Sequence, residues 1–182
     1  MISEEYQKQL VELHKSPAFG DKKEIPIDII KLIEEYKITS ILDFGCGKGL
    51  LVESIKTEYP EMLVHGYDPT NGQPLPDSVD MIMSFDVLEH VEPEFIDITL
   101  VDLKNRCNKI MYHLIACHPA KRVLDDGRNA HLIIETPDWW KNKISEHIGW
   151  DMINENIVSY TSNPKKGNPI EVVKYSVTLK NG

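Results

Sequence analysis

A nine-residue segment at positions 41–49, ILDFGCGKG, constrains the fold of this chain more than any other part of its sequence. Its first residues have the apolar pattern of a buried strand, its glycines indicate a turn, and amphipathic sequence typical of a helix follows to about Lys56. In open α/β sheets, such a turn lies at the carboxyl end of the first strand, where glycines let the backbone approach a nucleotide-like ligand closely. The segment therefore predicts an α/β sheet with a ligand site at this turn.

Length and composition are those of one globular domain. The chain has 182 residues, of which 27% are charged and 41% hydrophobic, and we expect a single domain over 1–182, with 1–25 forming an N-terminal helix and lid segment. Neither a membrane span nor a signal peptide is visible. The three cysteines lack paired or metal-type spacing, which favours reduced thiols and a cytoplasmic location.

The net charge of −9 argues against nucleic acid as a partner, because a general phosphate-binding surface would be basic. A local basic patch at Lys165 and Lys166 stays open beside the alternative of a solvated loop. The oligomeric state cannot be inferred from these residues.

Periodicity and turn residues predict the remaining elements. The spacing of Tyr6, Leu10 and Leu13 indicates a first helix, and Pro26 suits the first turn of a second. The connector SNPKKGNP has the composition of an antiparallel turn between the last two strands. Strands are predicted at 40–44, 63–67, 79–85, 109–115, 153–161 and 171–179, and further helices at 93–107 and 137–147.

This order of elements resembles that of the class I S-adenosylmethionine-dependent methyltransferases from Ile27 onward. The matching motifs are DFGCGKG at 43–49, GYD at 66–68 and FDVLEHV at 85–91. The resemblance implies a Rossmann-like, doubly wound sheet, mostly parallel with an antiparallel C-terminal strand pair. It also implies methyl transfer from S-adenosyl-L-methionine, with S-adenosyl-L-homocysteine as product, to a nucleophile that we expect on a small molecule. The implied cofactor-binding residues are Asp43, Gly45, Cys46, Gly47, Gly49, Asp68, Pro69, Phe85 and Asp86.

The chemistry of two acidic residues favours this cofactor over a nicotinamide dinucleotide. Asp43, at the entry to the glycine turn, would repel a pyrophosphate but attract the ammonium of the methionine moiety. Asp68 would accept hydrogen bonds from both ribose hydroxyls. A nicotinamide-dependent oxidoreductase is therefore the least favoured of three functional hypotheses. We interpret Cys46 as a small residue inside the loop rather than as a nucleophile.

One departure from the family pattern lies between the second and third predicted strands. Only residues 69–78 separate Asp68 from Val79, whereas a parallel crossover needs a dozen or more residues. The usual third strand and its helix should therefore be shortened or absent. The role of the family's adenine-side acid is either vacant or taken by 75–77.

A cofactor-binding module or accessory subunit without transfer activity is the alternative function.

Two residues after the 79–85 strand are candidates for catalysis or cofactor contact. If FDVLEHV begins helically, Asp86 and His90 share one face at i, i+4 spacing. His90 could then act as a general base. In the alternative interpretation, Asp86 supports the start of a helix and His90 packs or faces water.

The long segment from Ala116 to Glu135 is the best candidate for substrate recognition, because connections of this length are often functional. Arg128 and Asn129 are the candidate substrate-binding residues on it, and His131 is a second candidate general base. The alternative is an ordered loop in which Asn129 forms a turn and Arg128 an ion pair.

The adjacent residues Trp139 and Trp140 begin the 137–147 helix and cannot both point the same way. We expect one to fill the core, and Trp140 is the third candidate for substrate contact. His118 and His131 have no recognisable metal spacing, so no metal site is predicted.

Overall fold

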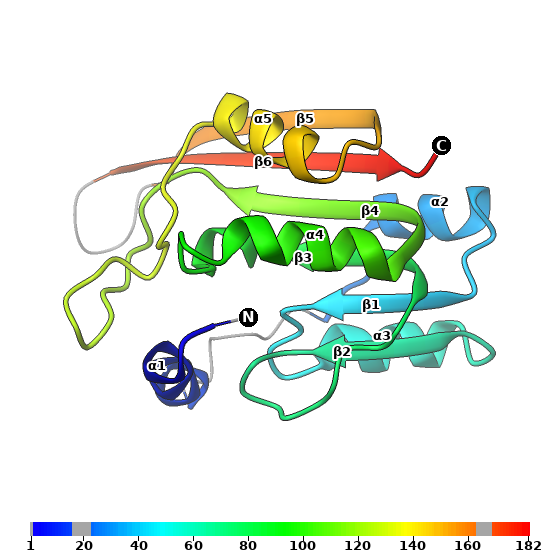
Figure 1. Cartoon of the computed structure of the whole chain (residues 1–182), viewed down its shortest axis with the longest axis horizontal. Helices are drawn as coiled ribbons and strands as arrows, with labels where there is room; N and C mark the ends of the chain where they lie inside the picture. The colour runs from blue at the N-terminus through cyan, green and yellow to red at the C-terminus, as the bar shows by residue number, and fades with distance from the viewer. Residues whose placement is uncertain (1, 16–22, 163–168) are drawn as a thin grey trace.

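The computed structural model of the chain describes residues 2–15, 23–162 and 169–182. None of the helices in these three ranges is long and apolar enough to cross a membrane. The elements, drawn in Figure 1, are α1 (Glu4–His14), α2 (Ile27–Glu35), β1 (Ser40–Phe44), α3 (Leu50–Glu58), β2 (Leu63–Tyr67), β3 (Val79–Phe85), the short 3₁₀ helix η1 (Leu88–His90), α4 (Ile96–Arg106), β4 (Cys107–Ala116), α5 (Pro137–His147), β5 (Asp151–Ser162) and β6 (Ile170–Lys180).

The strands form one six-stranded sheet in the order β2-β1-β3-β4-β6-β5. Strands β1 to β4 pair in parallel, and β6 pairs antiparallel with both β4 and β5. The chain builds outward from β1 to β2 and then continues on the other side of β1 with β3. The strand order therefore reverses between β1 and β3, which is where ligands of open α/β sheets bind. The predicted fold class is confirmed.

The connection between β2 and β3 is short, as predicted. Residues 69–78, all of them described, contain neither helix nor strand. Because no third strand is inserted here, β2 forms one edge of the sheet. Leu75 packs against the core.

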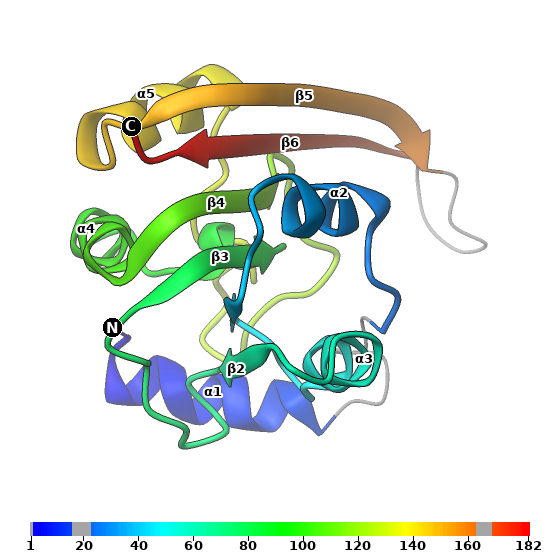
Figure 2. The ribbon, with the colours of Figure 1, turned by 90° about the vertical axis from the view of Figure 1, so that its right-hand side faces the viewer.

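Helices cover both faces of the sheet, as the edge-on view in Figure 2 shows. On one face, α2 and α3 pack Ile29 and Ile55 against Ile41 of β1. On the other, α4 and α5 pack Leu100 and Trp140 against a cluster that includes Leu42. Neighbouring strand residues thus enter opposite cores, which explains why the parallel strands are nearly continuous apolar runs.

The predicted boundaries of β1, β2, β3 and α5 agree with the structure. The α5 helix starts as expected, because Thr136 accepts a hydrogen bond from the Trp139 N–H and Pro137 occupies the first turn. The predicted 93–107 helix is shorter, since Cys107 begins β4. Most of the SNPKKGNP connector, including Lys165 and Lys166, lies outside the described residues.

Helix α1 belongs to neither face. It lies across the carboxyl end of the parallel strands, next to the long segment between β4 and α5 (Figure 1). Tyr6 and Leu10 of α1 pack there against Leu124 and Ala130 of that segment, in a third hydrophobic cluster. The helix and the segment together therefore cover the end of the sheet where β1, β2 and β3 finish.

Candidate functional site

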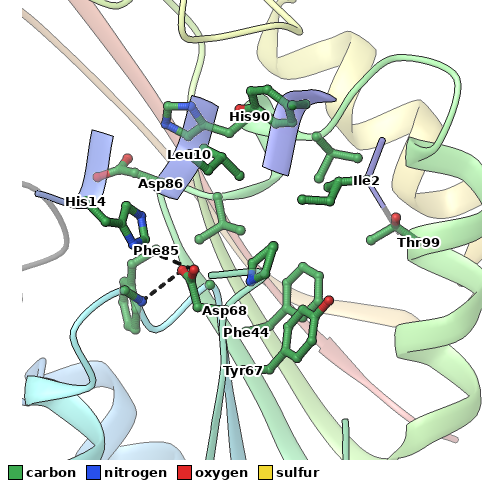
Figure 3. Close-up of a pocket in the computed structure, with 16 residues that line it drawn as sticks. Ile2, Leu10, His14, Phe44, Tyr67, Asp68, Phe85, Asp86, His90 and Thr99 are labelled. Carbon is green, nitrogen blue, oxygen red and sulfur yellow. Dashed lines mark hydrogen bonds and ion pairs between the residues drawn. The ribbon is translucent and has the colours of Figure 1, made fainter. Parts of the chain in front are cut away.

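A cavity of about 330 Å³ opens at the carboxyl ends of β1, β2 and β3. Its volume lies in the range of small-molecule sites, roughly 300–1,000 Å³. Figure 3 shows its walls, which come from three strand ends, η1, α4 and the N-terminal segment. The lining residues are Ile2, Tyr6, Leu10, His14, Phe44, Gly45, Gly47, Tyr67, Asp68, Pro69, Phe85, Asp86, Val87, His90, Val91 and Thr99.

The glycine turn forms the floor of this cavity because two glycines allow close packing. Gly45 has a φ of +80°, and a Cβ there would lie 2.3 Å from a methyl of Val87. The Gly45 N–H donates to the Tyr67 carbonyl at 2.7 Å, which holds the turn on β2. Gly66 in β2 leaves room for Cys46, since a Cβ at Gly66 would meet the thiol sulfur at 3.0 Å.

The Asp68 carboxylate lies at the end of β2 and faces the cavity (Figure 3). Its Oδ2 accepts a hydrogen bond from the Gly47 N–H at 3.1 Å. Its Oδ1 accepts from the N–H and the hydroxyl of Thr70, at 2.9 and 2.6 Å, and lies 3.7 Å from His14 Nδ1. The carboxylate is thus held against the glycine turn from one side and approached by α1 from the other.

Helix α1 supplies the opposite wall of the cavity, and polar contacts tie it to the rest of the site. Ser3, its N-cap, donates from its N–H and its hydroxyl to the two oxygens of Glu92, both at 2.7 Å. Gln7 donates to the Pro69 carbonyl at 2.6 Å. Tyr6 is 1% exposed, so its side chain is buried between α1 and the rest of the site.

The segment after β3 does not begin as a helix, so the condition under which Asp86 and His90 would share a helical face is not met. Asp86 adopts a left-handed conformation with a φ of +54°, and only Leu88–His90 form the 3₁₀ turn η1. The Asp86 carboxylate pairs with Lys174 of β6 at 2.7 Å. Left-handed backbone at a residue with a side chain is uncommon and concentrates at functional sites.

His90 nevertheless reaches the cavity wall. Its Nδ1 hydrogen-bonds the Ala130 carbonyl at 2.7 Å, which anchors η1 to the long segment. Burial, reinforced by the nearby His131, lowers the pKa of His90 to about 4. The ring is therefore neutral at pH 7.

Three further ionisable groups surround His90. The His131 ring lies edge-on to it with centroids 4.9 Å apart, and His118 lies 5.5 Å beyond His131. Glu89 is fully buried and accepts a hydrogen bond from the Ala116 N–H. Burial, reinforced by the charge of Asp86, raises the pKa of Glu89.

Three of the predicted cofactor-binding residues, Asp43, Cys46 and Gly49, lie in or beside the glycine turn but are not among the described residues that line the cavity. Asp43 is 4% exposed. The Cys46 sulfur accepts a hydrogen bond from the Asn71 side chain at 3.4 Å. Burial raises the pKa of Cys46 to about 12, so its thiol stays protonated at neutral pH. The other predicted cofactor-binding residues, Gly45, Gly47, Asp68, Pro69, Phe85 and Asp86, all line the cavity.

The three predicted substrate-binding residues do not line the cavity either. Arg128 pairs with Asp126 at 2.7 Å on the surface of the long segment. The Asn129 side chain bonds both backbone groups of Ala120 at 2.9 Å, so it braces that segment. Trp140 is fully buried in the core beneath α5.

Several wall residues were not predicted. Tyr6, Leu10 and His14 carry a visible helical pattern, but the pattern does not show where that helix packs. Glu89, which does not line the cavity but neighbours His90, was not predicted either, although it lies inside the FDVLEHV motif.

The strand order, the antiparallel last pair and a cavity at the strand-order reversal together define the fold of the class I S-adenosylmethionine-dependent methyltransferases. No family model and no curated protein matches the sequence. Solved structures match across nearly the whole chain.

One is magnesium protoporphyrin IX methyltransferase (ChlM) from Synechocystis with bound SAH, at 11% identity and a TM-score of 0.58, covering 97% of this chain and all of that one. The same enzyme with bound SAM matches at 15% identity and a TM-score of 0.56, covering 94% and 96%. TehB from Haemophilus influenzae matches at 15% identity and a TM-score of 0.54, covering 97% and 67%. At these identities, the similarity shows the fold.

Proposed function

We propose that this chain is a methyltransferase that binds S-adenosyl-L-methionine and methylates a nucleophile on a small molecule. The observation that carries the proposal is the Asp68 carboxylate, held against the glycine turn and facing a cavity at the strand-order reversal. The similar ChlM structures contain the methyl donor or its product, which supports the choice of cofactor.

The residues of this site fit the cofactor chemically. A carboxylate oxygen accepts two hydrogen bonds, and Oδ2 of Asp68 receives one from Gly47, which leaves acceptor capacity for a ribose hydroxyl. Asp43, at the end of β1, supplies the negative charge that attracts the ammonium of the methionine moiety. The N-terminus of α3, which begins after Gly49, favours the cofactor's carboxylate.

The chain contributes mainly by positioning. When bound, the cofactor supplies an electrophilic methyl group, so the protein must hold an acceptor in line and exclude water. Proximity of this kind contributes up to about 7–11 kcal/mol. Tyr6 and Leu10 of α1 exclude water from one side, and His90 and His131 remain candidates for accepting a proton. The long segment that carries Arg128 and Asn129 borders this site through the hydrogen bond between His90 and the Ala130 carbonyl, so we propose that the acceptor binds on the His90 side of the cavity.

Calorimetric titration with S-adenosylmethionine and S-adenosylhomocysteine tests the cofactor. We expect Asp68→Asn to weaken binding at least tenfold, because a hydrogen bond to a charged acceptor contributes about 1.5–3 kcal/mol. Asp151→Asn makes the same substitution at an exposed residue of β5, at the opposite edge of the sheet from β2, and should leave the affinity unchanged. Absence of binding of both ligands to the unmodified chain at millimolar concentration refutes the proposal.

Activity separates the enzyme from its alternatives. Transfer of a labelled methyl group to a member of a metabolite panel, lost in Asp68→Asn, would support the enzyme. Tight cofactor binding without turnover of any panel member, together with a stable complex with another protein, would support an accessory module instead. An oxidoreductase predicts binding of a nicotinamide dinucleotide, which the charge of Asp43 opposes.

A further inference from the structure

Three side chains from two distant segments converge beside the cavity. Glu89 and His90 belong to η1, and His131 belongs to the segment between β4 and α5. One potential ligand atom from each residue lies within 4.8 Å of the other two. Two imidazoles and one carboxylate form a donor set that binds first-row divalent cations and leaves coordination positions open.

The two histidines are oriented by backbone carbonyls. His90 Nδ1 bonds the Ala130 carbonyl at 2.7 Å, and His131 Nδ1 bonds the His118 carbonyl. A carbonyl oxygen only accepts, so Nδ1 carries the proton and Nε2 carries the lone pair of each neutral ring. This support of the second ring nitrogen is typical of metal-binding histidines, because it fixes the tautomer and the direction of the lone pair.

Glu89 provides a second, independent observation. Its side chain is fully buried, Oε1 accepts a hydrogen bond from the Ala116 N–H at 3.0 Å, and Oε2 has no hydrogen-bond partner among the residues that the structure describes. A buried polar oxygen without a partner is unfavourable, and such atoms are rare in folded proteins. A cation next to Oε2 would supply the missing interaction.

The charges around the group also suit a cation. The carboxylates of Asp86 and Glu89 lie on this side of the cavity, and the Lys174 ammonium pairs with Asp86 at 2.7 Å. Lys174 therefore offsets the charge of Asp86, and a cation at Glu89 would bind in place of the proton that the raised pKa of this carboxyl favours.

We propose that Glu89, His90 and His131 bind a first-row divalent cation such as Mn²⁺, Fe²⁺, Co²⁺ or Zn²⁺. Magnesium is disfavoured, because it prefers a shell of oxygen ligands. His90 also lines the cavity, so an ion bound there faces the ligand space. This part of the proposal rests on the proposed function: the methyl acceptor presents an oxygen atom to the open coordination positions of the ion. His90 then acts as a ligand rather than as a general base.

The test uses the untagged chain, treated with a chelator and exchanged into metal-free buffer. Calorimetry with MnCl₂ and with ZnCl₂ should show one site per chain, and CoCl₂ should produce a visible absorption band. Glu89→Gln and His131→Gln should each weaken binding at least tenfold, since even the loss of outer-shell partners lowers metal affinity about 10–100-fold. His65→Gln removes an exposed histidine of β2 and should leave the affinity unchanged.

Lack of binding to the unmodified chain at millimolar MnCl₂ and ZnCl₂ overturns the proposal, as does binding that both site variants retain. His131 is half-buried in a loop, so His131→Gln should fold even if Glu89→Gln does not. Thermal unfolding without metal checks this, and added MnCl₂ should raise the Tm of the unmodified chain but not that of His131→Gln. A parallel titration with S-adenosylmethionine keeps the hypotheses apart: cofactor binding without cation binding refutes only the cation site, and the reverse refutes only the proposed function.

Discussion

Adding a single methyl group at Gly45 should destabilise the fold much more than the same change four residues later. Gly45 and Gly49 both have positive φ values, +80° and +74°. Alanine in this region costs about 1–2 kcal/mol at either position. Their surroundings differ, because a Cβ at Gly45 would lie 2.3 and 2.5 Å from the two methyls of Val87, whereas a Cβ at Gly49 meets no atom within 4 Å.

Gly45→Ala therefore combines backbone strain with overpacking, and overpacking costs about 1–3 kcal/mol more. We expect the free energy of unfolding to fall by about 2–5 kcal/mol in Gly45→Ala and by about 1–2 kcal/mol in Gly49→Ala. Urea unfolding followed by tryptophan fluorescence measures both values, since the chain has three tryptophans.

The variant Val87→Ala isolates the steric part, because it removes both methyls that the new Cβ would meet. In that background, the backbone strain and one remaining contact, 3.0 Å from the Cβ of residue 87, should account for the cost of Gly45→Ala. The double variant should therefore be more stable than the sum of the two single losses implies, by up to about 1–3 kcal/mol. Equal losses in the two alanine variants, or strict additivity with Val87→Ala, would refute the explanation for glycine at position 45.

Three other predictions concern residues outside the glycine turn. Burial lowers the pKa of His113 from 6.5 to about 4, so as the pH falls from 6.5 to 4 the unfolded chain gains a proton that the folded chain does not. This histidine should therefore remove about 3 kcal/mol of stability over that interval, and His113→Gln should abolish this contribution in urea unfolding at pH 7 and pH 4. Ser3→Ala removes the N-cap of α1 and the hydroxyl's hydrogen bond to Glu92. Because the cap alone is worth about 1 kcal/mol, amide hydrogen exchange in α1 should accelerate by about fivefold or more while β1 is unaffected, and unchanged exchange in α1 would contradict this role. Trp140→Ala should lower the free energy of unfolding by about 3–5 kcal/mol because the indole is fully buried, and a loss below about 1 kcal/mol would show that the side chain is not a core residue.

The central sheet could be predicted because its strands are specified locally. VDMIMSF in β3 is almost continuously apolar since neighbouring residues enter opposite cores, and a run of that kind has few other structures open to it. The missing third strand could be predicted from the length of the 69–78 connection alone, because ten residues are too few for a parallel crossover. The left-handed Asp86 could not be predicted, because its conformation depends on contacts with Lys174 and with the Leu114 carbonyl, both on other strands.

Site residues in short local motifs could likewise be predicted, whereas contacts between distant segments could not. Gly45 and Asp68 could be identified because the turn and the strand end are short motifs with a known position in an α/β sheet. The contact between His14 and Thr70 joins residues 56 positions apart, and that between His90 and Ala130 joins residues 40 apart. Such pairs follow from the packing of α1 and the long segment, which neither helical periodicity nor turn composition specifies.

We expect the position of α1 to affect the kinetics of ligand exchange. A ligand in the cavity would contact the strand ends on one side and Tyr6 and Leu10 of α1 on the other. Hydrogen bonds from Ser3 and Gln7 hold this helix on the rest of the protein. The residence time of the ligand then depends on how often this helix detaches as well as on the contacts that the ligand itself makes. Two ligands of unequal affinity would consequently dissociate at more similar rates than their equilibrium constants suggest.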